Sequence, residues 1–175
     1  MNKKMLTLIQ DHTAELAVTP SALRNQGSRN VLPAARRFLK KLRLNRFSVN
    51  SRRKFREVLD SHTVALQKSL PTGARHWGSA RKALNLFLRD ALYNRYLSRH
   101  YGLNRVERWL EVPLDSFVAT GIRKALPLDA LPRWKGVKTL KPNLSDRYQA
   151  AARRVARAEG TPPVHLDLKW WRRKV

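Results

Sequence analysis

The chain has no cysteine, and this absence removes whole classes of chemistry. Disulfide bonds, thiolate nucleophiles, Cys-ligated zinc and cluster-bound iron all need a thiol, so none of them can occur in this sequence. The five histidines show no paired spacing such as i and i+4 along one helix, a common pattern of helical metal ligands. We therefore expect no metal site and no cofactor, and any catalysis must use other side chains.

Long apolar runs are also missing. No segment reaches the roughly 20 uninterrupted apolar residues that cross a bilayer. The N-terminal segment carries Asp11 and Glu15 where a secretory signal would be apolar. We expect a cytoplasmic protein that does not insert into a membrane.

Acidic residues are scarce. The sequence has 37 Lys and Arg against 12 Asp and Glu, a formal net charge of +25 at pH 7. So many like charges repel one another, and a folded domain tolerates them when it usually binds an anion. The commonest anionic partner of this kind is the nucleic-acid backbone. An anionic membrane surface is the competing partner. We favour nucleic acid and expect association with the nucleoid.

Hydrophobic periodicity predicts an all-α fold. Apolar residues recur at intervals of three and four, rather than two, along almost every patterned segment. A chain of 175 residues with 42% hydrophobic content can form one domain, residues 1–175, with its own core, and we expect a monomer. The expected helices span residues 5–16, 33–42, 51–70, 79–97, 116–125, 145–159 and about 163–173, and residues 127–143 form an irregular basic loop.

The helix expected at 79–97 has an apolar stripe and, beside it, a polar strip. The strip consists of Lys82, Asn85, Arg89, Tyr93 and Tyr96, which follow one another at three or four residues. The ordinary interpretation of such a strip is a face exposed to solvent.

Three short motifs stand in a fixed order along the chain. Residues 70–82 have the outline of a helix-hairpin-helix motif, in which a Gly-containing turn and a helix N-terminus offer backbone N–H groups to one DNA phosphate. Lys82 lies near the start of the second helix of this hairpin. Asp115 comes much later, in a Pro-Leu-Asp sequence, where it is expected to be the N-cap of the helix 116–125. Residues 161–171 contain Pro-Pro, His-Leu-Asp and a final Trp.

In this order the motifs resemble the helix-hairpin-helix DNA glycosylases, especially the archaeal 8-oxoguanine DNA glycosylase branch. The resemblance covers about residues 70–171. It implies a bifunctional DNA N-glycosylase and AP lyase that excises a damaged base, such as an oxidised purine, from duplex or single-stranded DNA. Lys82 would attack the anomeric carbon of the deoxyribose and form a Schiff base. Asp115 would stabilise the developing positive charge or move the proton.

The resemblance also implies a pocket for the extruded base. Asp167 would form hydrogen bonds with the base edge, and Trp171 would supply an aromatic wall. Gln26 is a further candidate for this pocket. The upstream tryptophan of that branch has no counterpart here, unless Phe47 or Phe55 substitutes for it.

Phosphate contacts are expected around the hairpin and after Asp115, with plain solubility as the alternative role for the same side chains. The residues concerned are Arg75, His76, Gly78, Ser79, Arg81, Arg89, Arg123 and Lys138.

Two other functions remain open. One is a non-catalytic DNA- or RNA-binding module that has the same scaffold without the chemistry. The other is a basic structural subunit of a ribonucleoprotein. A covalent adduct at Lys82, trapped with borohydride on damaged DNA, would favour the enzyme, whereas co-purifying RNA would favour the structural subunit.

Overall fold

The computed structural model describes residues 2–23, 25–26, 29–127 and 131–170, and every regular element in those ranges is helical. The all-α prediction is confirmed. None of the helices within these ranges is long and apolar enough to cross a membrane. The α-helices are α1 (Lys3–Ala17), α2 (Val31–Lys40), α3 (Arg52–Ser69), α4 (Trp77–Tyr93), α5 (Arg95–Tyr101), α6 (Ser116–Lys124), α7 (Pro142–Ala158) and α8 (Leu166–Trp170). Short 3-10 turns are η1 (Leu44–Phe47), η2 (Thr72–Ala74), η3 (Leu103–Arg105), η4 (Glu107–Trp109), η5 (Val137–Thr139) and η6 (Pro163–His165).

Polar side chains cap several of these helices. Asn2, Ser51 and Asp115 each accept a hydrogen bond from a backbone N–H two or three residues later, at the starts of α1, α3 and α6. Such a cap satisfies N–H groups that have no partner within the helix. The prediction that Asp115 is an N-cap is confirmed.

The helix expected at 79–97 is two helices. The backbone of Asn94 is extended, and its side-chain oxygen accepts hydrogen bonds from the N–H groups of Tyr96 and Leu97, both at 3.1 Å. This arrangement ends α4 at Tyr93 and starts α5. Tyr96 therefore does not belong to the polar strip of α4, and the prediction of one continuous helix is wrong at this point.

The C-terminal part also differs in detail from the expected elements. Helix α7 begins at Pro142 rather than near residue 145, because proline is well suited to the first position of a helix. The segment expected as a helix at 163–173 is the turn η6 followed by α8, and Trp171 lies outside the described residues. The described part of the loop 127–143 is irregular apart from η5 and the start of α7.

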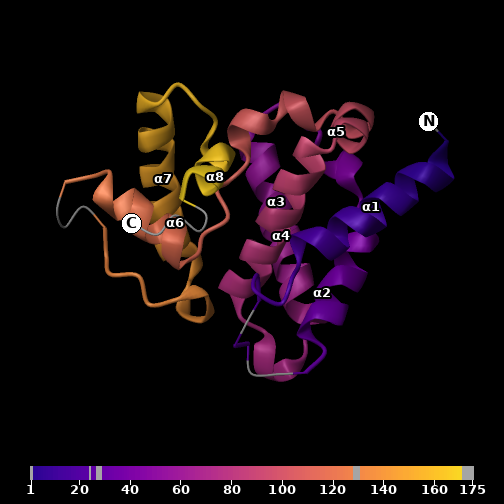
Figure 1. The fold of residues 1–175 in the computed structure, drawn as a ribbon, viewed down its shortest axis with the longest axis horizontal. Helices are drawn as coiled ribbons and strands as arrows, with labels where there is room; N and C mark the ends of the chain where they lie inside the picture. Colours follow the sequence, from indigo (N-terminus) through magenta and orange to yellow (C-terminus); the bar gives the residue numbers. More distant parts are fainter. Residues whose placement is uncertain (1, 24, 27–28, 128–130, 171–175) are drawn as a thin grey trace.

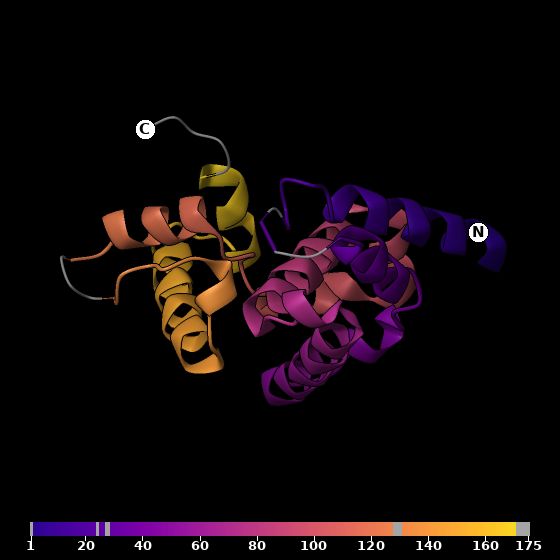
Figure 2. The same cartoon turned by 90° about the horizontal axis from the view of Figure 1, so that it is seen from below.

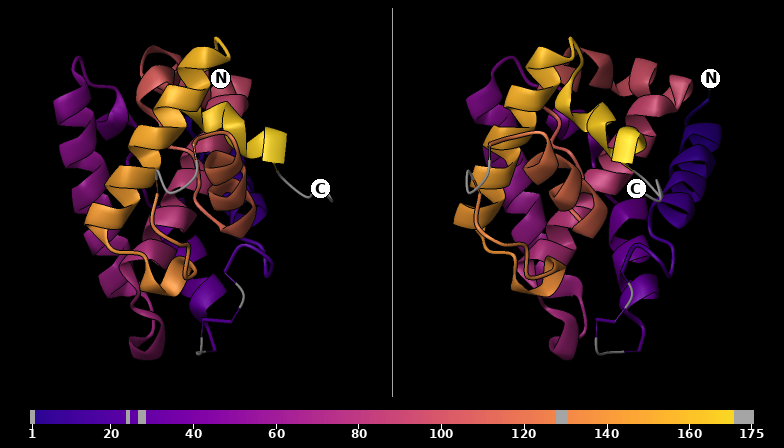
Figure 3. Two further views of the ribbon diagram at one scale, coloured as in Figure 1. Left: turned by 90° about the vertical axis from the view of Figure 1, so that its left-hand side faces the viewer. Right: turned by 60° about the vertical axis from the view of Figure 1, so that its left-hand side comes forward.

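Two hydrophobic clusters form the interior. One lies among α1 to α5, and the other is built from residues 112–166 of the C-terminal part. In Figure 1, α1 to α5 fill one side of the molecule and α6, α7 and α8 the other, with α3 and α4 nearest to the C-terminal group. Figure 2 shows the same division from below, and Figure 3 looks from the side of the C-terminal group, which lies in front. The single-domain assignment of residues 1–175 stays a prediction.

Candidate active site

Lys82 and Asp115, the two residues expected to carry the chemistry, lie side by side. The Nζ atom of Lys82 is 3.4 Å from Oδ2 of Asp115. The Lys82 side chain is 9% exposed and that of Asp115 is 21% exposed, so the pair lies at the edge of the interior and is in contact with solvent. Helix α4 starts earlier than expected, at Trp77, which places Lys82 in its second turn.

The two oxygens of Asp115 have different partners. Oδ1 accepts hydrogen bonds from the backbone N–H groups of Phe117 and Val118, at 2.9 and 3.0 Å. Oδ2 faces Lys82. The cap therefore fixes the carboxylate against α6 and leaves one oxygen directed at the amine.

Asp167, the expected base-pocket residue, belongs to the same neighbourhood. It is 2% exposed and forms an ion pair with Arg89 of α4. Burial raises the pKa of Asp167, and the negative charge of Asp115 acts in the same direction, while Arg89 and Lys82 oppose it. Three segments that are distant in the sequence thus bring Lys82, Asp115 and Asp167 within electrostatic reach of one another.

Gln26 lies beside the start of α4. It is buried, and its side-chain oxygen accepts a hydrogen bond from the hydroxyl of Ser79, one turn before Lys82. Ser79 itself is completely buried, so its hydroxyl is not available for the phosphate contact that we expected. The other expected wall of the pocket, Trp171, is outside the described residues.

Neither phenylalanine considered for the missing aromatic wall can take that place. Phe47 is 0% exposed and Phe55 is 2% exposed, and their rings contact each other edge to face with centroids 5.9 Å apart. Both belong to the core around α1 to α5, where a base cannot stack on them.

Gly78 is covered by η5 rather than open to a phosphate. A Cβ atom at this position would lie 2.2 Å from the carbonyl oxygen of Val137 and 2.6 Å from Cβ of Leu140. The glycine therefore serves the close approach of η5 to the start of α4, which is a role that the hairpin interpretation did not include.

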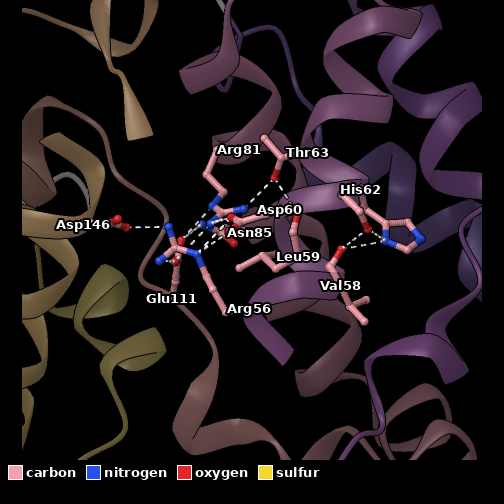
Figure 4. Close-up of polar contacts among 11 residues, drawn as sticks. Arg56, Val58, Leu59, Asp60, His62, Thr63, Arg81, Asn85, Glu111 and Asp146 are labelled. Atoms are coloured by element: carbon pink, nitrogen blue, oxygen red, sulfur yellow. Dashed lines mark hydrogen bonds and ion pairs between the residues drawn. The ribbon is translucent and has the colours of Figure 1, made fainter. Parts of the chain in front are cut away.

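Arg81 is a third correction among the expected phosphate contacts, after Ser79 and Gly78. It is 1% exposed, and its guanidinium donates to Glu111 at 2.9 Å, to Thr63 at 2.7 Å and to Asp60 at 2.5 Å. Figure 4 shows this group between α3, α4 and the segment that carries Glu111. These contacts link α4 to α3 and to the segment that carries Glu111. The buried Arg81 guanidinium therefore stabilises the fold and does not reach DNA.

Arg89 is the fourth correction among the expected phosphate contacts. Its side chain is 16% exposed and pairs with both Asp90 and Asp167. These two carboxylates keep the guanidinium over Asp167 instead of presenting it to a phosphate.

The remaining expected phosphate contacts are closer to solvent. Arg75 and Lys138 are exposed, and His76 and Arg123 are half-buried. Arg75 donates to the carbonyl of Leu70 within the hairpin. Lys138 belongs to η5, which covers the start of α4, and Arg75 and His76 directly precede that helix.

The polar strip of α4 is a seam between the two halves of the molecule and not a solvated face. Each strip residue bonds to a residue of the C-terminal part. The pairs are Lys82 with Asp115, Asn85 with Glu111, Arg89 with Asp167 and Tyr93 with His165. The solvated-face interpretation was wrong for Asn85 and Arg89, because Asn85 is 3% exposed, the Arg89 side chain is 16% exposed, and both pair with carboxylates of the C-terminal part.

Sequence reasoning missed a relay at the far end of this seam. The hydroxyl of Tyr93 lies 2.8 Å from Nδ1 of His165, and Nε2 of His165 lies 2.9 Å from Oε1 of Glu107. Burial raises the pKa of Tyr93 to about 12, with the charges of Asp167 and Asp90 adding to the shift and Arg89 opposing it. The His-Leu-Asp sequence could have indicated this relay, because His165 and Asp167 contact neighbouring positions on the same α4 strip.

Metal binding and known relatives add no further assignment. Within the described ranges, no three His, Asp or Glu side chains are grouped so that they could hold a metal ion. No protein-family model matches the chain, and no match is found among curated proteins or solved structures.

Proposed function

We propose that this protein is a DNA N-glycosylase with AP-lyase activity, in which Lys82 is the nucleophile and Asp115 its acid–base partner. The observation that carries the proposal is the 3.4 Å separation between the Lys82 amine and the Asp115 carboxylate. A nucleophile and its base must lie within such reach of each other before covalent catalysis is feasible. The net charge of +25 supplies the attraction for a DNA backbone.

In the proposed reaction Asp115 first accepts a proton from Lys82, which leaves the amine neutral and nucleophilic. The amine lone pair forms a bond to C1′ of the deoxyribose, and the electrons of the C1′–N bond leave with the base, which takes up the proton held by Asp115. Asp115 then accepts the proton that the new secondary ammonium loses and returns it to O4′ as the C1′–O4′ bond breaks, which opens the sugar ring to a Schiff base. Loss of a C2′ proton then breaks the C3′–O bond, and water releases the enzyme from the product.

Asp167 and Arg89 are assigned to substrate positioning. The buried Asp167 carboxylate offers acceptor oxygens for a donor group on a base edge. Arg89 holds this carboxyl in place from α4. Trp171 and Gln26 remain candidates for the walls of the same pocket.

A second function is supported by a different observation. All four pairs of the α4 strip link α4 to residues of the C-terminal part, and an ion pair between Lys82 and Asp115 is one of them. In a non-catalytic nucleic-acid-binding module, the Lys82–Asp115 pair would only stabilise the contact between α4 and the C-terminal part.

Borohydride trapping separates the two functions. Oligonucleotides that contain 8-oxoguanine or an abasic site are incubated with the protein and reduced, and the adduct is mapped to a peptide by mass spectrometry. Mapping is required because any exposed lysine of so basic a protein can react with an abasic aldehyde. The enzyme proposal expects the adduct on Lys82 and release of the damaged base before strand cleavage.

The variants are chosen to keep the fold. Lys82→Arg retains the charge next to Asp115 but has no nucleophilic amine, so the adduct and base release should disappear while the melting temperature stays close to that of the wild type. Asp115→Asn retains the cap oxygen and should slow trapping by about 10²–10⁴-fold. Lys54→Arg, an exposed site on α3, is the matched control. Tight binding without an adduct on Lys82 would establish the module instead.

A further inference from the structure

A basic groove lies between α2 and α3, away from the Lys82 site. Its volume is about 760 Å³, which is within the usual range of ligand-binding clefts. The lining residues come from α2, the segment that follows it and α3, and none belongs to α4, α6 or α8. Whatever occupies the groove therefore does not touch Lys82 or Asp115.

Four cations line this groove: Arg37, Lys41, Arg43 and Arg46. All four are exposed, and within the described ranges none of their side chains forms an ion pair or hydrogen bond. No Asp or Glu is among the lining residues. The neighbouring cations on α2, Arg36 and Lys40, are instead paired with Glu15 of α1. The charge that faces the groove is thus left without an internal counter-ion, although the next face of the same helix has one.

Apart from Ser61 and Ser69, the remaining lining is apolar or aromatic. Phe38 and Val58 are half-buried against the core, and the His62 ring packs against Phe47 with centroids 5.2 Å apart. Nδ1 of His62 donates to the carbonyl of Val58 at 2.8 Å, which holds the ring in place. Figure 4 shows Val58 and His62 on α3 directed away from the Arg81 network, so α3 has one face toward the seam and another toward the groove.

We propose that this groove binds a single-stranded segment of nucleic acid, with phosphates on the four cations and a base against Phe38. Cations next to an apolar or aromatic floor are the combination that single-strand sites use, because the backbone is anionic and unstacked bases need a surface to replace their stacking partners. A duplex keeps its bases covered and would use the charges but not the floor. The inference does not depend on the chemistry of Lys82.

Fluorescence anisotropy with a labelled oligothymidylate of about 12 nucleotides tests the proposal. The double variant Arg37→Gln/Lys41→Gln removes two groove cations. The matched control, Arg52→Gln/Lys54→Gln, removes two exposed cations from the start of α3, outside the groove. The groove variant should bind roughly tenfold or more weakly, and the slope of log K against log salt should fall by about 0.7 for each phosphate that the variant no longer neutralises. The control should change little.

A third variant probes the floor. Phe38→Leu keeps an apolar side chain but removes the ring, so affinity should fall by about fivefold or more with no change in the salt slope. A charge patch without stacking would leave the affinity of Phe38→Leu unchanged, and that result overturns the proposal. Equal effects of the groove and control variants also overturn it.

Two further measurements distinguish a single-strand site from a duplex site and from a membrane-binding surface. A duplex of the same length that binds equally well, and is weakened equally by the groove variants, would refute a single-strand site. The single-strand site would also be refuted if the groove variants bound phosphatidylserine vesicles more weakly than the wild type does but bound the oligonucleotide equally well. Lys82→Arg should bind oligothymidylate like the wild type, and the groove variant should still form the Lys82 adduct at saturating protein. Failure of one proposal is therefore distinguishable from failure of the other.

Discussion

A single glycine on α6 determines how closely α8 can approach. A Cβ atom on Gly121 would lie 2.3 Å from Cδ2 of the Trp170 ring and 2.4 Å from Cε2. The contact is with a rigid ring, so a methyl group cannot be accommodated by a small torsional change. Because α8 also carries Asp167, the same contact helps to position the candidate pocket.

Gly121→Ala should destabilise the protein by about 2 kcal/mol, in the range of overpacked core positions. Urea unfolding followed by circular dichroism measures the change. In a Trp170→Ala background the same substitution should cost nothing or even stabilise, because alanine is the better helix former once the ring is gone. Equal costs in both backgrounds would show that the ring does not set the spacing.

Tyr93 allows a pH prediction at the residue scale. Its pKa is raised to about 12 from an ordinary value of 10.0, so the folded state holds the phenolic proton more tightly than the unfolded state. The stabilisation is present in full below about pH 10 and is lost as the pH rises toward 12. Absorbance at the phenolate band, taken as the difference between wild type and Tyr93→Phe, should show a midpoint near pH 12 while the protein stays folded. A midpoint at the ordinary value would contradict the structure.

The sequence could predict one pair of the site but not the partners of the neighbouring residues. The order of the motifs predicts that Lys82 and Asp115 share one site, and the structure has the Lys82 amine 3.4 Å from the Asp115 carboxylate. Arg81, the next residue before Lys82, was assigned to the same DNA surface. A rotation of about 100° per residue turns it instead toward Asp60 and Glu111, which no local pattern connects to it.

At the scale of elements, the break between α4 and α5 depends on one side chain. The Asn94 oxygen accepts hydrogen bonds from Tyr96 and Leu97, and its backbone conformation leaves the helical region. Apolar periodicity runs through this point, because Leu92 and Leu97 both face the core. Periodicity could therefore locate the helical region but not the interruption within it.

Asn94→Ala should cost about 1 kcal/mol in the free energy of unfolding, the usual value of an N-cap. Asn94→Asp keeps an acceptor at the same place and should cost much less. Chemical denaturation of the two variants side by side provides the measurement. If alanine is tolerated as well as aspartate, the cap does not stabilise α5.

At the scale of the whole molecule, α4 connects two hydrophobic clusters through opposite faces. Its apolar stripe belongs to the cluster around α1 to α5, and its polar strip pairs with the C-terminal part. The helix content and the stripe could be predicted from periodicity, whereas the second cluster could not, because it depends on pairs that are distant in the sequence. Truncating Arg81 alone would leave the buried carboxylate of Glu111 without its Arg81 partner. Removing one member of a buried ion pair costs more stability than replacing both members with apolar residues.

The charge distribution leads to a prediction for the molecule as a whole. The ion pairs Arg81–Glu111 and Arg89–Asp167 are largely buried and are screened weakly by salt, whereas the four cations of the α2–α3 groove are exposed and form no ion pair within the described ranges. Salt therefore weakens repulsion more than it weakens the pairs that hold the fold. Raising NaCl from about 50 to about 500 mM should increase the melting temperature by a few degrees, which corresponds to about 1 kcal/mol. Arg37→Gln/Lys41→Gln, with less repulsion to relieve, should gain less. A melting temperature that falls with salt would mean that ion pairs, rather than the surplus of positive charge, dominate the electrostatic part of the stability.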